Sequence, residues 1–287
     1  SLSKLEAYAS KDPRIRVFSK PNGGALNARN YGVRQACSKW LYRMDADDLL
    51  SPDLLEEMIR TANEQDADYV IPEQVHWWPD QPEKTYYFNR EHGVFEKLSG
   101  REALIKSLMW EFHGRAMCRL DTYMKYTFDS DIGFIDEYVA RLVILNSRKI
   151  VYSKGEYYYR QNAGSLCYKP SVRRFHVLER SRLSEQLLLT VCDDPQTIHN
   201  YRRLLFGELI GCTRLYLSQY RLFDKEERRQ IVELLTAAYR RTDKKAFHGY
   251  CLKPGWNNKY LGMLSFTNWT VFRIALLLQN RIHAFRN

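Results

Sequence analysis

The stretch WLYRMDADD, residues 40–48, decides how this chain of 287 residues is interpreted. Its first five residues have the pattern of a short buried strand, and three carboxylates follow at once: Asp45, Asp47 and Asp48. Ligands of open α/β sheets bind beyond the carboxyl ends of the strands, so we expect a site here. Three neighbouring carboxylates repel one another unless a positive group lies between them, and a hard divalent cation that also binds a diphosphate fits this need. The alternative is a solvated acidic turn before the helix predicted from Ser51.

Strands and helices alternate around this stretch, from the start of the chain to about residue 170. The turn PNGG at residues 21–24 follows a strand predicted around Ile15 and Val17. Ser99 and Glu102 form a capping box, which predicts the start of a helix. The other predicted strands cover residues 68–75, 84–88, 94–97, 149–153 and 157–160. The other predicted helices cover residues 25–37, a segment from residue 51 onward, and residues 134–146.

The rest of the chain differs in both pattern and charge. Long amphipathic stretches rich in Leu and Arg predict helices over residues 171–192, 196–220, 225–241 and 268–285. Residues 171–287 hold 20 Lys and Arg against 10 Asp and Glu, which accounts for the whole net charge of +10. The sequence therefore predicts an α/β domain over residues 1–170 and a basic helical C-terminal region over residues 171–287.

The composition excludes several classes of protein. A hydrophobic content of 45% without low-complexity tracts excludes a disordered chain. No apolar stretch approaches the roughly 18–20 residues that a membrane span requires. The six cysteines include no Cys-x-x-Cys pair, so zinc and redox motifs are not expected. Reduced thiols in a cytosolic protein fit this cysteine usage.

The turn at residues 21–24 opens a longer series of motifs. In chain order they are NGG (22–24), ARNYG (28–32), DADD (45–48), PD (52–53), FDSDIGFIDEYV (128–139), YYYR (157–160) and Ser165. In order and spacing the series resembles the family 2 glycosyltransferases, especially bacterial enzymes that build surface polysaccharides. The resemblance spans about residues 1–170 and implies the GT-A fold, a Rossmann-like mixed sheet flanked by helices. Residues 171–287 resemble no family.

The resemblance also implies a reaction. A family 2 enzyme of this type transfers a sugar from a nucleotide-diphosphate sugar, here expected to be a UDP-sugar, to a hydroxyl of a saccharide or lipid-linked saccharide. By resemblance, Asp45 and Asp47 contact the nucleotide ribose and hold Mn²⁺ or Mg²⁺, and Asp48 orients the metal shell or the donor sugar. The cation neutralises charge on the departing diphosphate. The implied class is an inverting hexosyltransferase of polysaccharide biosynthesis.

Asp136 matches the aspartate that acts as general base in the family. Its expected role is to remove the proton of the acceptor hydroxyl, and its place at a helix start favours a negative charge. The family has Glu directly before this Asp, whereas this chain has Ile135. The register therefore leaves an alternative, in which Glu137 is the base and Asp136 supports it. A purely structural interpretation is that both acids favour the helix start.

Four further positions are candidate binding residues. Arg29 lies where the family has a basic residue near the donor, and Arg160 precedes a loop that can close over the diphosphate, which suits a guanidinium. Asn22 belongs to the NGG turn and contributes either a donor contact or a plain turn. The aromatic run His76-Trp77-Trp78 either stacks on an acceptor sugar or packs in the core.

The first and last segments of the sequence each differ from the family pattern. Family members begin with a strand and two loops that grip the nucleotide base, and these are not found before Ser1, so the chain is expected to lack its first nucleotide-binding strands. At the other end, the amphipathic stretch from Trp269 to Arg286 suggests peripheral attachment to an anionic membrane surface, on the cytoplasmic face, or packing on the domain. The alternatives to an enzyme are a non-catalytic relative that binds ligand and a basic protein that binds nucleic acid, for which no motif is evident.

Overall fold

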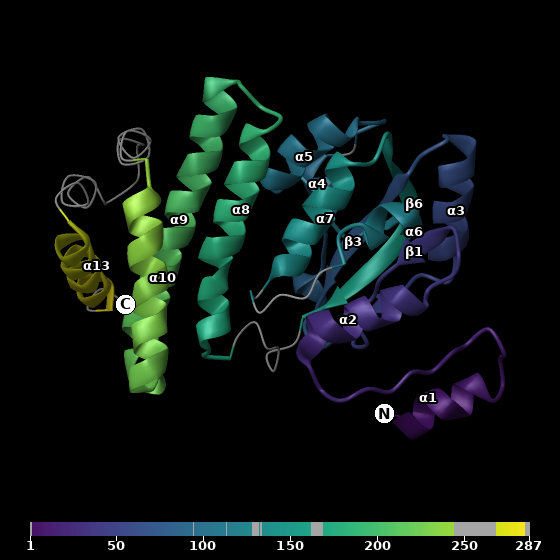
Figure 1. Ribbon diagram of the computed structural model, residues 1–287, viewed down its shortest axis with the longest axis horizontal. Coiled ribbons are helices and arrows are strands. Elements are labelled where there is room, and N and C mark those ends of the chain that lie inside the picture. Colours follow the sequence, from purple (N-terminus) through teal and green to yellow (C-terminus); the bar gives the residue numbers. More distant parts are fainter. Residues whose placement is uncertain are drawn as a thin grey trace.

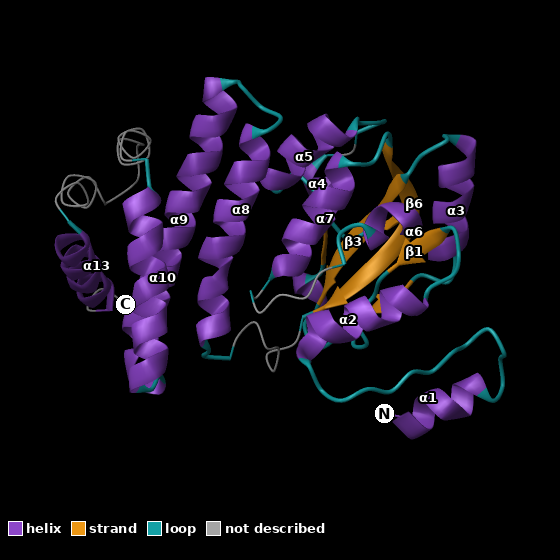
Figure 2. Ribbon diagram, viewed as in Figure 1, coloured by secondary structure: helices purple, strands orange, loops and turns teal. Residues whose placement is uncertain are grey.

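The computed structural model describes residues 2–93, 95–112, 114–127, 132, 134–161, 169–243 and 268–284. Within them one mixed sheet has helices on both faces, and further helices are stacked outward from one face (Figure 1). Figure 2 shows that the strands lie together in one half of the molecule and that the other half is helical.

The sheet has six strands in the order β1-β5-β3-β6-β2, with β4 paired to β3. The strands are β1 (Trp40–Tyr42), β2 (Leu49–Leu50), β3 (Tyr69–Trp77), β4 (Tyr86–Tyr87), β5 (Met117–Arg119) and β6 (Ile150–Arg160). The long strands β3 and β6 are parallel, and every other pair is antiparallel. The register of β3 on β6 shifts between Ile71 and Glu73, because Pro72 has no N–H for the ladder.

The helices follow the sequence patterns closely. Their bounds are α1 (Leu2–Ala9), α2 (Gly24–Gln35), α3 (Leu54–Glu64), α4 (Phe88–His92), α5 (Gly100–Leu108), α6 (Leu120–Met124), α7 (Ile135–Leu145), α8 (Val177–Leu189), α9 (Pro195–Gln219), α10 (Lys225–Arg241) and α13 (Trp269–Ala284). Three 3₁₀ turns are η1 (Pro82–Lys84), η2 (Val172–His176) and η3 (Tyr220–Leu222). The capping box predicted at Ser99 is confirmed, since its hydroxyl accepts from the Glu102 N–H and Glu102 returns the bond.

Each face of the sheet has its own core. On one face α3 packs Leu54, Met58 and Ala62 against sheet residues Val70, Met117 and Val151. On the other face α5 and α7 bury a larger cluster that includes Leu104, Leu108, Val143 and Ile144. Gly155 lets the start of α3 approach β6, because an added Cβ would lie 2.7 Å from both the Cα and the Cδ1 of Leu54.

We therefore expect Gly155→Ala to lower the free energy of unfolding by about 1–3 kcal/mol, since the added methyl overpacks the contact between α3 and β6. The matched control is Gly211→Ala in α9, where an added Cβ meets nothing within 4 Å. That control removes a helix glycine and should raise stability by about 0.5–1 kcal/mol. Urea unfolding of both variants measures the two effects. An equal response at the two positions would contradict the close approach at Gly155.

The helical region packs directly on the α/β domain. Leu187 and Leu188 of α8 and Tyr201 of α9 belong to the same core cluster as α5 and α7. A separate cluster joins α8, α9, α10 and α13 farther out. The α/β domain and the helical region that follows residue 170 therefore share one hydrophobic core. We propose that residues 171–287 are nevertheless a separate unit of the sequence, whose helices α8 and α9 pack on the α/β domain.

The structure assigns the apolar face of α13 to this outer cluster. Phe272 and Leu276 are fully buried, and Trp269 packs against the same cluster. These three residues therefore pack on the outer cluster of the helical region rather than on the α/β domain. Phe285 and Arg286 lie outside the described residues. Among the residues that the structure describes, no helix combines the length and the apolar character that a bilayer crossing requires.

Several predicted strand boundaries were wrong. Ile15 and Val17 lie in an irregular segment with no sheet partner among the described residues, and residues 95–97 form a loop, with Val94 outside the description. Residues 149–153 and 157–160 belong to one continuous strand, β6. Helix α3 begins at Leu54, after a turn and the short strand β2, rather than at residue 51. The alternation of apolar and polar residues within one segment does not show whether another strand lies beside that segment.

Candidate active site

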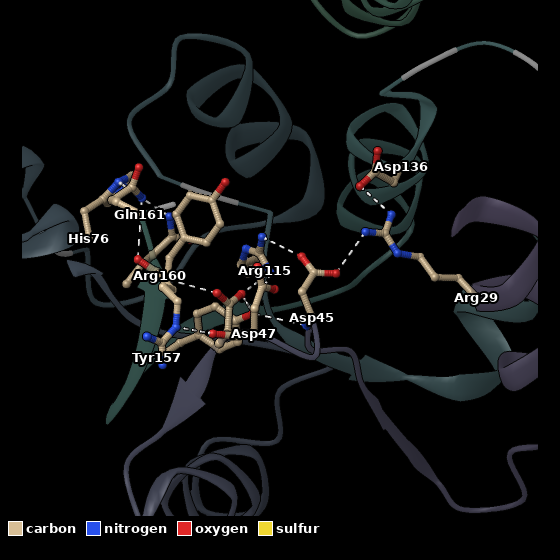
Figure 3. Close-up of polar contacts among 12 residues, drawn as sticks. Arg29, Asp45, Asp47, His76, Arg115, Asp136, Tyr157, Arg160 and Gln161 are labelled. Carbon is tan, nitrogen blue, oxygen red and sulfur yellow. Dashed lines mark hydrogen bonds and ion pairs between the residues drawn. The ribbon is translucent and has the colours of Figure 1, made fainter. Parts of the chain in front are cut away.

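Three segments far apart in sequence bring their charges together beyond the end of β1. Arg29 of α2 donates from Nη1 to Asp136 Oδ2 at 2.7 Å and from Nη2 to Asp45 Oδ1 at 3.1 Å. Asp45 follows β1, and Asp136 lies in the first turn of α7. Figure 3 shows Arg29 between the two carboxylates. Three sequence-predicted residues thus form one cluster, in which about a third of each carboxylate side chain is exposed.

Arg115, which no motif indicated, holds the acidic segment from the other side. Its Nη2 donates to Asp45 Oδ2 at 3.1 Å, and its Nη1 donates to the Tyr157 hydroxyl at 2.7 Å. Burial acts to raise the pKa of Asp45, but Arg115 and Arg29 outweigh it and lower that pKa below its usual value. Asp45 is therefore an ionised carboxylate with a guanidinium on each oxygen (Figure 3).

Asp48 is a structural carboxylate in this structure. Its side chain is 1% exposed, and its Oδ2 accepts from the Tyr157 hydroxyl. Its Oδ1 accepts from the backbone N–H of Arg160 at 2.9 Å. Burial raises the pKa of Asp48 above its ordinary value. These bonds fix the acidic loop to the end of β6 and engage both carboxylate oxygens of Asp48.

Asp47 is the exposed member of the three. Among the described residues its carboxylate has no hydrogen-bond or ion-pair partner. Its backbone carbonyl accepts from Arg160 Nε at 2.7 Å, and the Arg160 guanidinium lies 4.4 Å from the Trp77 ring centroid. Arg160 therefore holds the loop that presents Asp47.

Glu137 points away from this cluster. Its Oε2 accepts from Arg180 of α8 and from Arg141 of α7, the latter at 3.5 Å. Arg180 also donates to Glu208 of α9 at 2.8 Å. The two adjacent acids of α7 thus serve different partners: Asp136 faces Asp45 through Arg29, and Glu137 joins α7 to the helical region.

The remaining candidates have local roles. Asn22 Oδ1 accepts from the Gly24 N–H at 3.0 Å, so the plain-turn interpretation matches its described contact. His76 stacks on Tyr86 with ring centroids 4.5 Å apart, which is packing within the β3–β4 hairpin. Tyr157 is fully buried. Ser165 and residues 128–131 lie outside the described residues.

An open cleft of about 200 Å³ begins at the Arg29 cluster and runs along α7. Asp45, Arg29 and Asp136, each about a third exposed, line one part of the cleft, which we call its mouth. The buried side chains of Gln74, Ser107 and Arg141 line the other part, which we call its inner end. The lining residues include Arg43, Gln74, Ser107, Trp110, Arg141 and Tyr159. Polar groups gathered in a cleft at the carboxyl end of a sheet are the usual setting of a ligand site.

The donor set fits a divalent cation held by one protein carboxylate. Both oxygens of Asp45 are engaged by arginines, and Asp48 is buried, which leaves Asp47 to coordinate a cation. Within the described ranges no group of three or more acidic, His or Cys side chains forms a ligand cage. Mg²⁺ and similar cations are commonly held by one or two carboxylates together with substrate phosphates. The prediction that Asp45 is also a metal ligand disagrees with its two ion pairs.

Comparison with known proteins agrees with this architecture. Residues 1–120 match the profile of the family described as Glycosyl transferase family 2. The chain is 26% identical over 173 residues to glycosyltransferase GlyG of Streptococcus pneumoniae serotype 4, covering 56% of this chain and 57% of that protein. It is 26% identical over 179 residues to the uncharacterized glycosyltransferase EpsJ of Bacillus subtilis, covering 58% of this chain and 52% of that protein. The chain therefore spans about half the length of these curated relatives.

Solved structures show the same fold. S. aureus TarS 1-349 in complex with UDP-GlcNAc superposes with a TM-score of 0.63 and 16% identity, over 98% of this chain and 79% of that one. TarS 1-349 alone superposes with a TM-score of 0.66 and 14% identity, over 99% of this chain and 79% of that one. The mixed sheet, its flanking helices and these matches together show that the chain has the GT-A fold, and its residues 1–120 match the model of glycosyltransferase family 2.

Proposed function

We propose that this chain transfers a sugar from a nucleotide-diphosphate sugar to a hydroxyl of a saccharide or lipid-linked saccharide, with inversion at the anomeric carbon. The observation that supports it best is the junction of Asp136, Arg29 and Asp45 at the mouth of the cleft. The junction combines a carboxylate that can remove a proton with one guanidinium that can donate to a diphosphate. A UDP-sugar is the proposed donor, since TarS was solved with UDP-GlcNAc and with UDP.

In the proposed mechanism Asp136 takes the proton of the acceptor hydroxyl as its oxygen attacks the anomeric carbon. The new C–O bond forms on the face opposite the diphosphate, and the bond to the diphosphate breaks with its electron pair leaving on the diphosphate oxygen. Arg29 and Arg160 lie where a guanidinium can donate to phosphate oxygens. Mn²⁺ or Mg²⁺, held by Asp47 and the diphosphate, would supply Lewis-acid stabilisation of the leaving group.

Product stereochemistry tests this proposal. The chain, with Mn²⁺, is incubated with UDP-glucose, UDP-galactose or UDP-GlcNAc and a panel of methyl glycosides, and the reaction is followed by ³¹P and ¹H NMR. We expect UDP to appear together with a β-anomeric proton in the product, because these donors are α-linked. An α-linked product would contradict inversion, and consumption of no donor would contradict transfer.

A surface patch on the helical region supports a further proposal, attachment to an anionic membrane surface. Leu222 is 64% exposed and Ile274 is 49% exposed, and both line a groove between η3 and α13. Arg221 and Arg273 line the same groove, which gives it positive charge beside apolar side chains. Elsewhere in this region many arginines are paired with carboxylates, including Arg202 with Glu185. Such pairing does not favour a nucleic-acid surface.

We expect the double variant Leu222→Asp/Ile274→Asp to reduce co-sedimentation with phosphatidylglycerol vesicles about tenfold, because two apolar anchors are lost. The matched control is Leu189→Asp, which changes a leucine of similar exposure, 47%, at the end of α8. The control should bind vesicles like the parent chain. Equal binding by all three proteins would contradict membrane attachment through this groove.

A further inference from the structure

Four residues toward the inner end of the cleft belong to no motif, and among them only Arg141 has a contact described above, its weak bond to Glu137. They are Gln74 of β3, Ser107 of α5, Trp110 just after α5, and Arg141 of α7. Asp136, Glu137, Ala140 and Arg141 all line the cleft from α7, so the inner end is continuous with the mouth.

Gln74 brings an unsatisfied acceptor to this place. The residue is 3% exposed, and its Nε2 lies 3.1 Å from His76 Nε2. Its Oε1 is buried and has no hydrogen-bond partner among the described residues. Buried amide oxygens are nearly always paired, so an orphan beside a cleft indicates a group that arrives with a ligand.

Arg141 brings a donor whose present contacts are weak. Its side chain is 8% exposed, yet its Nε has no partner among the described residues. Its Nη atoms reach the Glu137 carbonyl at 3.3 Å and Glu137 Oε2 and the Ser107 carbonyl at 3.5 Å. Good N–H···O bonds measure about 2.7–3.2 Å, so this buried guanidinium has spare hydrogen-bonding capacity.

Trp110 adds an aromatic surface held in an unusual backbone conformation. Its φ is +62°, in the left-handed region, where a bulky residue is strained. The residue stays 36% exposed while Arg141 and Arg180 lie 5.3 Å and 5.8 Å from its ring centroid. Strain of this kind persists where the surrounding structure fixes a side chain in place, which is typical of ligand sites.

We propose that the inner end of the cleft binds one sugar ring, with Gln74 accepting from a ring hydroxyl, Arg141 donating to another oxygen, and Trp110 covering the apolar C–H face. Sugar hydroxyls both donate and accept, and the opposite ring faces are apolar, so this set of groups matches a sugar better than a flat apolar ligand. A cleft of about 200 Å³ suits one ring rather than an oligosaccharide. The inference rests on the proposed function, and the ring belongs to the donor or to the acceptor.

Calorimetric titrations with UDP, UDP-glucose and UDP-GlcNAc in the presence of Mn²⁺ test this assignment. We expect Gln74→Met to weaken the binding of the nucleotide sugars about 5- to 10-fold, which is the effect of one lost hydrogen bond. The affinity for UDP should stay within about twofold of the parent value. The matched control is Gln219→Met, because Gln219 Oε1 is also buried without a described partner but lies at the end of α9, far from this cleft. The control should bind all three ligands like the parent chain.

Trp110→Gly is the second variant, since glycine adopts a positive φ without strain and circular dichroism can verify the fold. It should show the same selective loss. To distinguish an acceptor ring, methyl glucoside and methyl N-acetylglucosaminide are titrated into the chain saturated with UDP and Mn²⁺. Loss of glycoside binding in Gln74→Met and Trp110→Gly, with nucleotide sugars unchanged, assigns the inner end to the acceptor and supports the proposal.

Two results overturn the assignment and leave the proposed function standing. One is that both variants weaken the binding of UDP and of the nucleotide sugars equally. The other is unchanged binding of every sugar ligand by both variants. By contrast, absence of UDP binding by the parent chain contradicts the proposed function itself.

Discussion

Replacing Asp136 with Asn is expected to lower the rate of sugar transfer by about 10²–10⁴-fold, the range that a positioned general base contributes. The amide cannot accept the proton of the acceptor hydroxyl, while its oxygen can still accept the bond from Arg29. UDP affinity should therefore stay within about twofold of the parent value, which places the loss in kcat rather than in donor binding. Initial rates of UDP release and a UDP titration measure the two quantities.

Glu137→Gln is the matched control, because it changes the neighbouring acid of the same helix. Glu137 is paired with Arg141 and Arg180 and faces the helical region. Its replacement should lower stability and leave most of the activity of the remaining folded protein. Loss of transfer in a stable Glu137→Gln variant, with Asp136→Asn still active, would assign the base to Glu137 instead.

Replacing Arg180 with Met is expected to lower the free energy of unfolding by about 3–5 kcal/mol, as when one partner of a buried ion pair is removed. Arg180 is 6% exposed and joins Glu137 of α7 to Glu208 of α9. Without it, the half-buried Glu208 loses its guanidinium bond, and Glu137 keeps only its weaker contact with Arg141. Arg182→Met is the control, since Arg182 pairs with Glu179 on the same helix at a more exposed position, where a pair contributes about 0–1 kcal/mol.

The effect of Arg180→Met should also depend on pH. Burial already raises the pKa of Glu208 above its usual value, and removal of Arg180 raises it further. The native variant then binds more protons than its unfolded chain, so its stability rises as the pH falls. We expect the destabilisation to shrink between about pH 7.5 and pH 4.5 in urea unfolding. A destabilisation that is independent of pH would contradict a role for uncompensated carboxylates.

The sequence predicted the site's position because its motifs lie at the ends of regular elements. The DADD segment follows a strand, and Asp136 lies in the first turn of a helix with a clear apolar stripe. Their junction through Arg29 confirms that these segments meet. Residue type and spacing were enough there, since strand ends and helix starts gather at one edge of an α/β sheet.

The rest of the site depends on contacts that no local pattern contains. Arg115 lies in the irregular segment before β5 and belongs to no motif, and its partners Asp45 and Asp48 are more than 60 residues away. The different roles of Asp136 and Glu137 also depend on Arg180, which lies in a helix that contains none of the motifs. Whether an Asp or Glu side chain is available to a ligand or holds the structure together depends on its ion pairs with residues far away in the sequence.

The most direct test of the central claim, a nucleotide-sugar site built on the DADD segment, is a calorimetric titration of UDP with and without Mn²⁺. It is carried out on the parent chain and on Asp47→Ala, which removes the exposed carboxylate and leaves the ion pairs of Asp45 intact. The account predicts UDP binding that requires Mn²⁺ in the parent chain and is lost in Asp47→Ala. UDP binding that is absent from the parent chain, or that ignores both Mn²⁺ and Asp47, would contradict it.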